Sequence, residues 1–193
     1  MTDLTERAQA WIAADPDPIT RNELAEMLAA GASDELEDRM AGTLQFGTAG
    51  LRGAVEAGSN RMNRATVIRA TAGLASYLLS TTEPEDRLVV IGRDARPSSQ
   101  SFMDDSIGVL RAAGFGVRYF EEPTPTPLVA YAELVLGACA SIVITASHNP
   151  PADNGYKVYA ANGAQIVPPV DTDIADRIAQ VGPANEVPRA ADP

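Results

Sequence analysis

Four short, mainly apolar runs, the first three separated by longer segments with helical periodicity, restrict the fold more than any other feature of this sequence. The runs lie at 88–91, 117–120, 141–144 and 156–159, and the first contains only Leu, Val and Ile. Segments with apolar residues three and four positions apart lie before and between the first three runs. Strands that alternate with helices indicate an α/β fold with a largely parallel sheet. We predict a three-layer αβα domain with a mixed sheet of about four strands.

The connection between the last two runs is short, and this sets their relative direction. Residues 145–155 leave too little room for the helical crossover that a parallel pair requires. We therefore expect the strands at 141–144 and 156–159 to be antiparallel. Within the connection, Asp153-Asn154-Gly155 is predicted to form a turn.

The residues on either side of this domain have different patterns. Helical periodicity near the N-terminus is interrupted by Asp15-Pro16-Asp17-Pro18, because proline disfavours the α conformation in the residue before it. Thr20 and Glu23 have the spacing of a capping box, so a helix is predicted to begin at Thr20 and to end at Gly31. We assign 1–43 to a helical N-terminal extension, 44–182 to the main domain, and 183–193 to a linker toward a second domain.

The composition limits the partners and the location of the protein. A formal net charge of −11 argues against nucleic acid or an anionic membrane as a partner. An anionic substrate would have to be captured by local cations. The single cysteine, Cys139, and the single histidine, His148, exclude an intrachain disulfide and a zinc site of the Cys/His type. The acidic N-terminus lacks the apolar segment of a signal peptide, and we expect a cytoplasmic protein that does not span a membrane.

A polar loop follows the apolar run at 141–144. In α/β sheets, ligands bind beyond the carboxyl ends of the strands. Ser147, His148 and Asn149 lie at such an end, and Lys157 follows on the next predicted strand. A nucleophilic hydroxyl near a base and a cation suits phosphoryl transfer through serine. The same residue types also form ordinary turns, so a purely structural loop explains the local sequence equally well.

The residues around Ser147 argue against a serine hydrolase. The nucleophile elbow of that class requires glycine two positions before and two positions after the serine. Thr145 and Asn149 occupy those positions here. The chain also has no second histidine to serve as the base, and the adjacent His148 is badly placed to meet the serine hydroxyl.

Three segments resemble the active-site signatures of the α-D-phosphohexomutases, the family of phosphoglucomutases and phosphomannomutases. Residues 145–159, which begin Thr-Ala-Ser-His-Asn-Pro-Pro, are similar to its phosphoserine signature. Residues 46–53, Phe-Gly-Thr-Ala-Gly-Leu-Arg-Gly, resemble its N-terminal active-site loop, and 92–99 resemble its third signature. The three occur in the family's order. The glycine-rich form of 47–53, with Asn-Arg-Met-Asn at 60–63, looks most like the branch of bacterial phosphoglucomutases and phosphopentomutase-like enzymes.

The resemblance implies catalytic roles for four residues. Ser147 matches the serine that carries the phosphoryl group, and Lys157 matches an active-site lysine that acts as general acid/base or stabilises charge. Arg52 matches an arginine near the phosphoserine. His148 matches a residue beside the phosphoserine, where orienting the loop and transferring a proton are both open roles.

Further matched positions are expected to shape the phosphate-binding loops. Thr145 and Asn149 are expected to hold the backbone of the serine loop. Arg96 is assigned either to substrate phosphate or to an internal salt bridge with Asp94. Ser98 is predicted to cap the helix that follows it. The residues assigned to substrate or phosphate loops are Thr48, Gly50, Arg96, Thr145 and Asn149.

The resemblance also implies Mg²⁺, bound through the phosphate on Ser147 and through a loop of the form Asp-x-Asp-x-Asp-Arg. The sequence does not contain that loop, because its two similar segments, at 15–17 and 171–173, stop at two carboxylates. We therefore expect an N-terminal domain whose partners are the missing C-terminal domains of the same protein. The 193 residues are expected to fold alone and to be inactive as a mutase.

The function implied by the resemblance is that of a phosphosugar mutase. Such an enzyme interconverts hexose 1-phosphate and hexose 6-phosphate through a phosphoserine and a sugar bisphosphate, which also acts as activator. We expect glucose phosphates to be favoured over mannose phosphates. The alternatives are a phosphopentomutase, a sugar bisphosphate synthase and a non-catalytic domain that binds phosphosugars.

Overall fold

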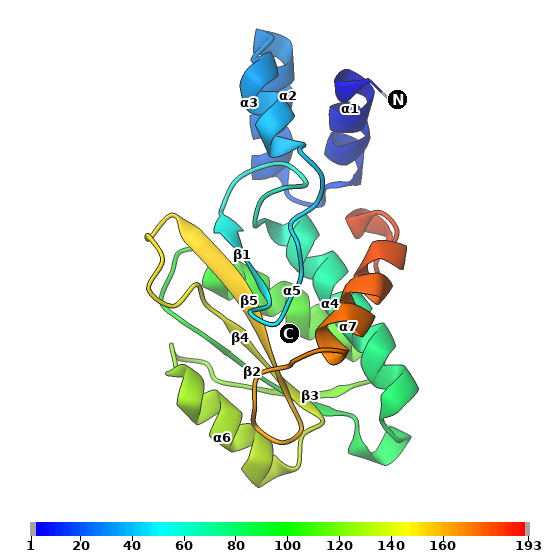
Figure 1. Cartoon of the computed structure of the whole chain (residues 1–193), viewed down its shortest axis with the longest axis vertical. Coiled ribbons are helices and arrows are strands. Elements are labelled where there is room, and N and C mark those ends of the chain that lie inside the picture. The colour runs from blue at the N-terminus through cyan, green and yellow to red at the C-terminus, as the bar shows by residue number, and fades with distance from the viewer. Residues whose placement is uncertain (1–2, 192–193) are drawn as a thin grey trace.

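A mixed five-stranded sheet forms the centre of the molecule in the computed structural model, which describes residues 3–191 (Figure 1). The strand order is β1-β5-β4-β2-β3. β2 is parallel to both β3 and β4, whereas β5 is antiparallel to β4 and to β1. The predicted antiparallel pair is thus confirmed. The strands are β1 (Leu51–Ala54), β2 (Leu88–Arg93), β3 (Gly116–Tyr119), β4 (Ala140–Ile144) and β5 (Asp153–Ala160).

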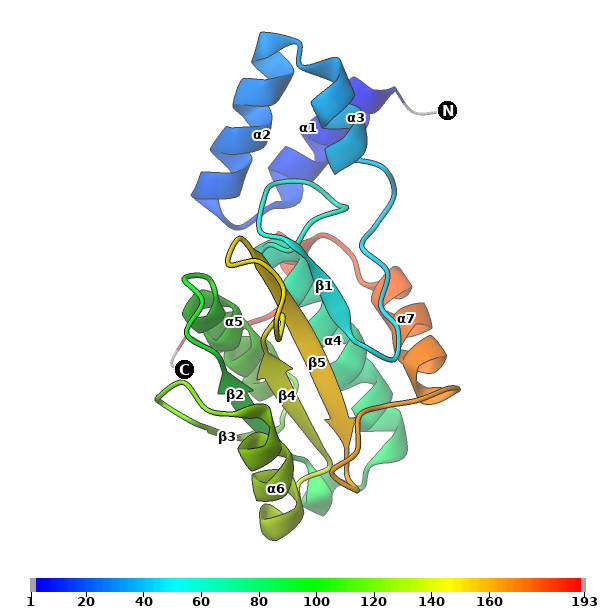
Figure 2. The same cartoon turned by 60° about the vertical axis from the view of Figure 1, so that its left-hand side comes forward.

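Helices cover both faces of the sheet, which confirms the three-layer αβα fold (Figures 1 and 2). α5 packs on β2, β3 and β4, and α4 packs between α5 and α7 on the same side. α6 packs on β2 and β4 from the opposite side. The helices are α4 (Arg64–Thr81), α5 (Ser99–Ala112), α6 (Thr126–Leu136) and α7 (Val170–Gln180), with short 3₁₀ helices η1 (Pro84–Asp86) and η2 (Ala184–Glu186).

The apolar runs at 88–91 and 141–144 form central strands because both of their faces are buried. Along β2, Val89 and Ile91 join the large core beneath α4 and α5. Val90 points the other way and packs with Val129 of α6. Every residue of β4 is buried. A strand covered on both sides cannot alternate polar and apolar residues, which explains its continuous apolar sequence.

One strand was not anticipated from the sequence. β1 lies within the glycine-rich segment that was predicted to be a loop, and it forms one edge of the sheet. Its four residues pair with β5, with Leu51 opposite Tyr156 and Arg52 opposite Gly155. Four residues with a glycine among them carry little strand signal of their own. The pairing partner, more than a hundred positions away in the sequence, determines this strand.

Three helices near the N-terminus form a small unit beyond one end of the sheet (Figure 2). They bury a common apolar cluster that includes Ala8, Leu24 and Leu36. The predicted capping box at Thr20 was wrong, because the second helix begins earlier, at Pro18, where the Asp17 side chain accepts a hydrogen bond from the Ile19 amide at 2.9 Å. These helices are α1 (Leu4–Ala14), α2 (Pro18–Ala30) and α3 (Ser33–Arg39), and Gly31 ends α2 as predicted.

The segment after α7 lies against the body of the domain. Ala184 is buried beside α4, and the Ala190 amide donates to the Gly108 carbonyl of α5 at 2.9 Å. Arg189 forms an ion pair with the buried Asp105, which Arg64 also contacts. The assignment of 183–193 as a linker stays a prediction, and its last two residues lie outside the described part. No helix within residues 3–191 is long and apolar enough to cross a membrane.

Candidate active site

The loops that follow β2 and β4 lie side by side because these two parallel strands end in register. Arg93, the last residue of β2, pairs with Ile144, the last residue of β4. The Asp94 amide then donates to the Ile144 carbonyl at 3.0 Å. Figure 2 shows β4 and β5 side by side, with the yellow connection between them at the end of the sheet nearer the N-terminal helices. The serine loop therefore lies at the carboxyl edge of the sheet, as predicted.

Ser147 is held in an unusual backbone conformation in that loop. Its φ is 57°, and among the described residues it is the only non-glycine residue with a positive φ. This conformation costs about 1–2 kcal/mol for an L-residue. The cost is offset locally, since the Ser147 amide donates to Thr145 Oγ1 at 2.9 Å and the Asn149 amide donates to the Ala146 carbonyl at 3.1 Å. The turn leaves the Ser147 side chain exposed.

Lys157 contacts the serine directly. Its Nζ donates a hydrogen bond to Ser147 Oγ at 2.7 Å. The contact arises because β5 runs antiparallel to β4, which places Lys157 opposite Val143 and next to the loop. Burial lowers the pKa of Lys157, and the positive charge of Arg52 lowers it further. A lysine with a lowered pKa releases and takes up its proton more readily near neutral pH, as an acid–base group requires.

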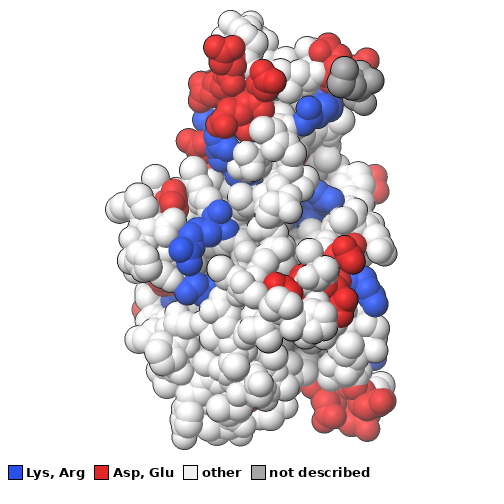
Figure 3. Space-filling view, viewed as in Figure 1, with Lys and Arg blue, Asp and Glu red and all other residues white. Residues whose placement is uncertain are grey.

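Arg52 approaches the same loop from the edge strand. Its Nη1 donates to Asn149 Oδ1 at 3.2 Å, and the Asn149 amide group donates to Asp153 Oδ2 at 2.8 Å. Arg52 and Lys157 thus flank the serine loop on an otherwise acidic chain. Figure 3 shows basic side chains over the β1 and β5 side of this face, whereas acidic side chains gather over the N-terminal helices and near η1. Local cations of this kind can attract a phosphate in spite of the net charge of −11.

Arg96 holds the serine loop through its backbone. Its guanidinium nitrogens donate to the carbonyls of Pro150 (2.5 Å), Asp153 (2.8 Å), Asn149 (2.9 Å) and Ser147 (3.3 Å). Its Nε pairs with Asp94 at 2.9 Å, which confirms the internal salt bridge. With these donors engaged, Arg96 positions the loop in this structure.

Asp94 is the anion that fixes Arg96. Burial alone would raise its pKa, but hydrogen bonds from the Ser99 hydroxyl and the Arg96 amide outweigh burial and hold the pKa below its usual value. The carboxylate is therefore charged at neutral pH. Ser98 occupies the N-cap position of α5, as predicted, but its side chain makes no capping hydrogen bond, and its Oγ accepts one from Asn154 Nδ2 at 2.8 Å.

Asp153, Asn154 and Gly155 were predicted to form a turn, but all three belong to β5. The buried Asn154 also donates to Ser99 Oγ at 3.0 Å, so it ties β5 to the start of α5. A Cβ on Gly155 would lie 2.6 Å from the Thr145 carbonyl oxygen and 2.7 Å from that of Leu51. A glycine inside a strand is the available sequence signal for such a close backbone approach.

The glycine-rich turn before β1 is locked against β5. The Gly50 amide donates to the Gly47 carbonyl at 2.7 Å, and Gly50 has a φ of 74°. A Cβ on Gly50 would lie 1.9 Å from the Tyr156 carbonyl oxygen, so only glycine fits. The carbonyl of Thr48 accepts from Gln165 Nε2 at 2.7 Å, and its side chain is exposed.

His148 is exposed and has no hydrogen-bond partner among the described residues. Its assignment to catalysis or to loop orientation therefore stays a prediction.

The groups around Ser147 do not by themselves fit Mg²⁺. Within residues 3–191 there is no group of three or more His, Cys, Asp or Glu side chains that could hold a metal ion. The charged group in contact with Ser147 Oγ is the ammonium of Lys157, whereas Mg²⁺ requires oxygen ligands. A phosphate on Ser147 would be one such ligand, and the others would have to come from outside this domain.

The fold and the position of the serine loop define an α/β domain that binds its ligand at the carboxyl edge of a mixed sheet. Residues 43–184 match the family described as phosphoglucomutase/phosphomannomutase, alpha/beta/alpha domain I, and the chain belongs to this family.

The curated relatives include a phosphoribomutase of Saccharomyces cerevisiae, 41% identical over 180 residues, and a glucose 1,6-bisphosphate synthase of Mus musculus, 41% identical over 171 residues. These matches cover 92% and 85% of this chain, but only 29% and 28% of the relatives. A solved structure from Thermus thermophilus, provisionally described as a phosphomannomutase, matches with a TM-score of 0.69 and 30% identity. That match covers 78% of this chain and 32% of the other.

Proposed function

We propose that this chain is the phosphoserine domain of a phosphosugar mutase and that Ser147 carries the phosphoryl group. The observation that supports the proposal is the 2.7 Å hydrogen bond between Lys157 Nζ and Ser147 Oγ, in a loop that turns the serine outward. A hydroxyl with a proton-transfer partner at this distance has the geometry of an activated nucleophile.

In the first half of the reaction, the bond between Ser147 Oγ and phosphorus breaks. A sugar hydroxyl forms the new bond to phosphorus and passes its proton to water, and Lys157 protonates the serine oxygen as it leaves. In the second half, Ser147 Oγ attacks the other phosphate of the sugar bisphosphate, and the bond between that phosphorus and its sugar oxygen breaks. The serine proton passes to Lys157, and the sugar oxygen takes up a proton from water. Arg52 stabilises the negative charge on the transferring group.

The remaining parts of the enzyme would lie outside this domain. The chain spans about 30% of the length of its curated relatives, which leaves room for further domains in a protein of their size. We propose that those domains select the sugar, bind the second phosphate and supply the other ligands of Mg²⁺, which would provide charge stabilisation when bound. A sugar bisphosphate would act as activator by phosphorylating Ser147. The cytoplasmic location stays a prediction.

The sugar is the open part of the proposal. From the sequence we expect glucose phosphates, whereas relatives named phosphoribomutase and glucose 1,6-bisphosphate synthase favour pentose phosphates or bisphosphate synthesis. Assays of the intact protein with glucose, mannose and ribose 1-phosphates, each with Mg²⁺ and the matching bisphosphate, distinguish these activities. A non-catalytic domain would bind these sugars without turnover.

The test of the common step is covalent labelling. The intact protein is incubated with a sugar bisphosphate, and its peptides are analysed by mass spectrometry. We expect phosphate on Ser147, and we expect Ser147→Ala to lose both the label and turnover. Ser101→Ala, in α5, is the matched control and should retain both. Near-normal turnover of Ser147→Ala would contradict the proposal.

A further inference from the structure

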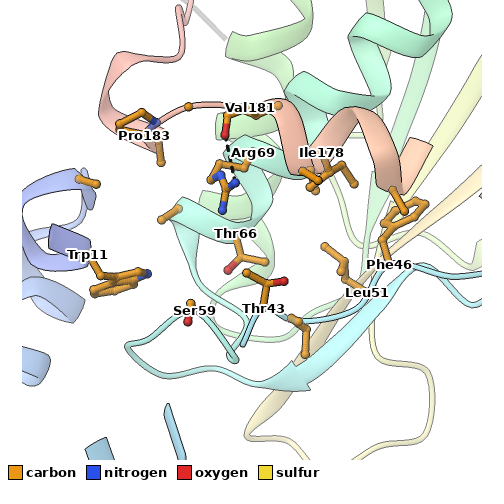
Figure 4. A pocket seen from close by; sticks show the side chains of 18 of the residues that line it. Trp11, Thr43, Phe46, Leu51, Ser59, Thr66, Arg69, Ile178, Val181 and Pro183 are labelled. Carbon is orange, nitrogen blue, oxygen red and sulfur yellow. Dashed lines mark hydrogen bonds between the residues drawn. The ribbon is translucent and has the colours of Figure 1, made fainter. Parts of the chain in front are cut away.

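A cavity of about 710 Å³ lies between the N-terminal helices, the segment before β1, and helices α4 and α7 (Figure 4). Its volume falls within the range of small-molecule sites. Apolar walls are formed by Trp11, Phe46, Leu51 and Ile178. The serine loop and Lys157 do not line the cavity, although Phe46 and Leu51 belong to the glycine-rich segment that carries Arg52.

Arg69 of α4 is the cation of this cavity. Figure 4 shows its side chain between Trp11 and Ile178, with its nitrogens near the middle of the lining residues. Nη2 donates to the Val181 carbonyl at 3.0 Å, whereas Nε is buried and has no hydrogen-bond partner within the described chain. No carboxylate among the described residues forms an ion pair with it. Burial lowers the pKa of Arg69, which reflects the unfavourable desolvation of its charge.

Arg87 and Arg93 also have a buried Nε without a partner, but neither lines the cavity, and two other partly buried arginines are paired with acids. Arg39 contacts three glutamates and Arg64 pairs with Asp105. Asp15 and Asp176 also line the cavity, but neither forms an ion pair with Arg69. The Asp15 carboxylate accepts hydrogen bonds from the Thr20 hydroxyl and the Asp17 amide, and Asp176 is exposed on α7.

A guanidinium has five N–H donors, and the one bond to Val181 leaves donors on Nη1 and Nη2 that suit the two oxygens of a carboxylate or phosphate. An aromatic and aliphatic wall beside such a cation suits a ligand with an apolar body. We propose that this cavity is a second ligand site, which binds a small organic anion with its carboxylate or phosphate on Arg69 and its apolar part against Trp11 and Phe46.

The test uses benzoate and phenyl phosphate as probes, so that carboxylate and phosphate heads are compared on one apolar body. Benzamide lacks the charge, and inorganic phosphate lacks the apolar part. Trp11 is the only tryptophan in the chain, so its fluorescence reports binding at this wall directly. We expect at least one aromatic anion to bind saturably to the 193-residue chain, and at least tenfold more tightly than benzamide or inorganic phosphate.

Variants show whether Arg69 is responsible. Arg69→Gln should weaken binding of that anion at least tenfold. Arg87→Gln is the matched control, because Arg87 also has a buried and unpartnered Nε but does not line the cavity. It should bind as the unmodified chain does. Circular dichroism checks that each variant is folded, and if Arg69→Gln is not, Ala179→Phe fills the cavity from α7 and should abolish binding.

Two results would overturn the proposal. One is the absence of saturable binding of both aromatic anions to the unmodified chain. The other is that the folded Arg69→Gln variant binds the anion as tightly as the unmodified chain does. If Arg69→Gln does not fold, the same result with the folded Ala179→Phe variant would overturn the proposal.

Discussion

Gly50→Ala is the substitution for which the structure gives the sharpest expectation. Gly50 has a φ of 74°, where an alanine costs about 1–2 kcal/mol relative to ordinary backbone. The added Cβ would also lie 1.9 Å from the Tyr156 carbonyl oxygen, against about 3.4 Å for ordinary contact. That oxygen belongs to the backbone of β5, so it cannot rotate away as a side chain could.

Relief requires the turn and β5 to separate by about 1.5 Å, the shortfall in that contact. Overpacking of this kind costs about 1–3 kcal/mol, so the combined loss is roughly 2–5 kcal/mol of unfolding free energy. For a chain of this length, that corresponds to a fall in melting temperature of about 5–15 °C. The separation would also shift β1, and with it Arg52, away from Asn149.

Gly47→Ala is the control. Gly47 lies in the same turn but has no positive φ, and a Cβ added to it would meet no atom of the described residues within 4 Å. It should change the unfolding free energy by less than about 1 kcal/mol. Urea denaturation of the 193-residue chain, followed by far-UV circular dichroism, measures both variants. Equal stabilities for Gly50→Ala and Gly47→Ala would refute the reasoning.

Three further predictions concern side chains. Lys157→Met in the intact protein should lower turnover by about 10²–10⁴-fold, with less than about 1 kcal/mol change in stability, and unchanged turnover would remove Lys157 from the mechanism. Arg96→Lys should destabilise the chain by about 2–4 kcal/mol in urea, because one ammonium cannot replace contacts with four carbonyls. Glu133 is buried, and desolvation raises its pKa, so its carboxyl group ionises less readily in the folded chain than in the unfolded chain. Wild-type stability relative to Glu133→Gln should therefore be highest below pH 4.5 and fall as pH rises from there through the folded pKa. A pH-independent difference between the two would contradict this.

The central strands could be predicted from the sequence because burial on both faces leaves a direct composition signal. β2 and β4 lie within two residues of the apolar runs at 88–91 and 141–144, whereas β3, predicted to within one residue at 117–120, is an edge strand in which only Val117 is buried. β1 could not be predicted, because its conformation comes from pairing with β5 and from the fit of Gly50. The start of α2 was misplaced because two candidate caps, Asp17 and Thr20, compete within four residues, and Pro18 favours the earlier one.

The proximity of Ser147 and Lys157 could be anticipated, since a short connection returns the chain along the next strand. The role of Arg96 could not, because its partners are backbone carbonyls, which carry no side-chain signature. The cavity at Arg69 was equally hidden. Its walls come from the N-terminal helices, the segment before β1, α4 and α7, and only the folded chain brings them together.

In the serine loop, hydrogen bonds to the neighbouring residues hold Ser147 in a strained backbone conformation. Ser147 adopts its positive φ because Thr145, Arg96 and the start of β5 fix the residues on both sides of it. Strain of this size persists only where the neighbouring structure enforces it, and it favours one orientation of the hydroxyl. The charged group in contact with that hydroxyl is a cation, Lys157, and a second cation, Arg52, contacts Asn149 in the same loop. A phosphate on Ser147 would therefore find its charge partly balanced here, but its metal ligands elsewhere. If Ser147 carries the phosphoryl group as proposed, the domain that holds this serine would therefore still require metal ligands from further domains.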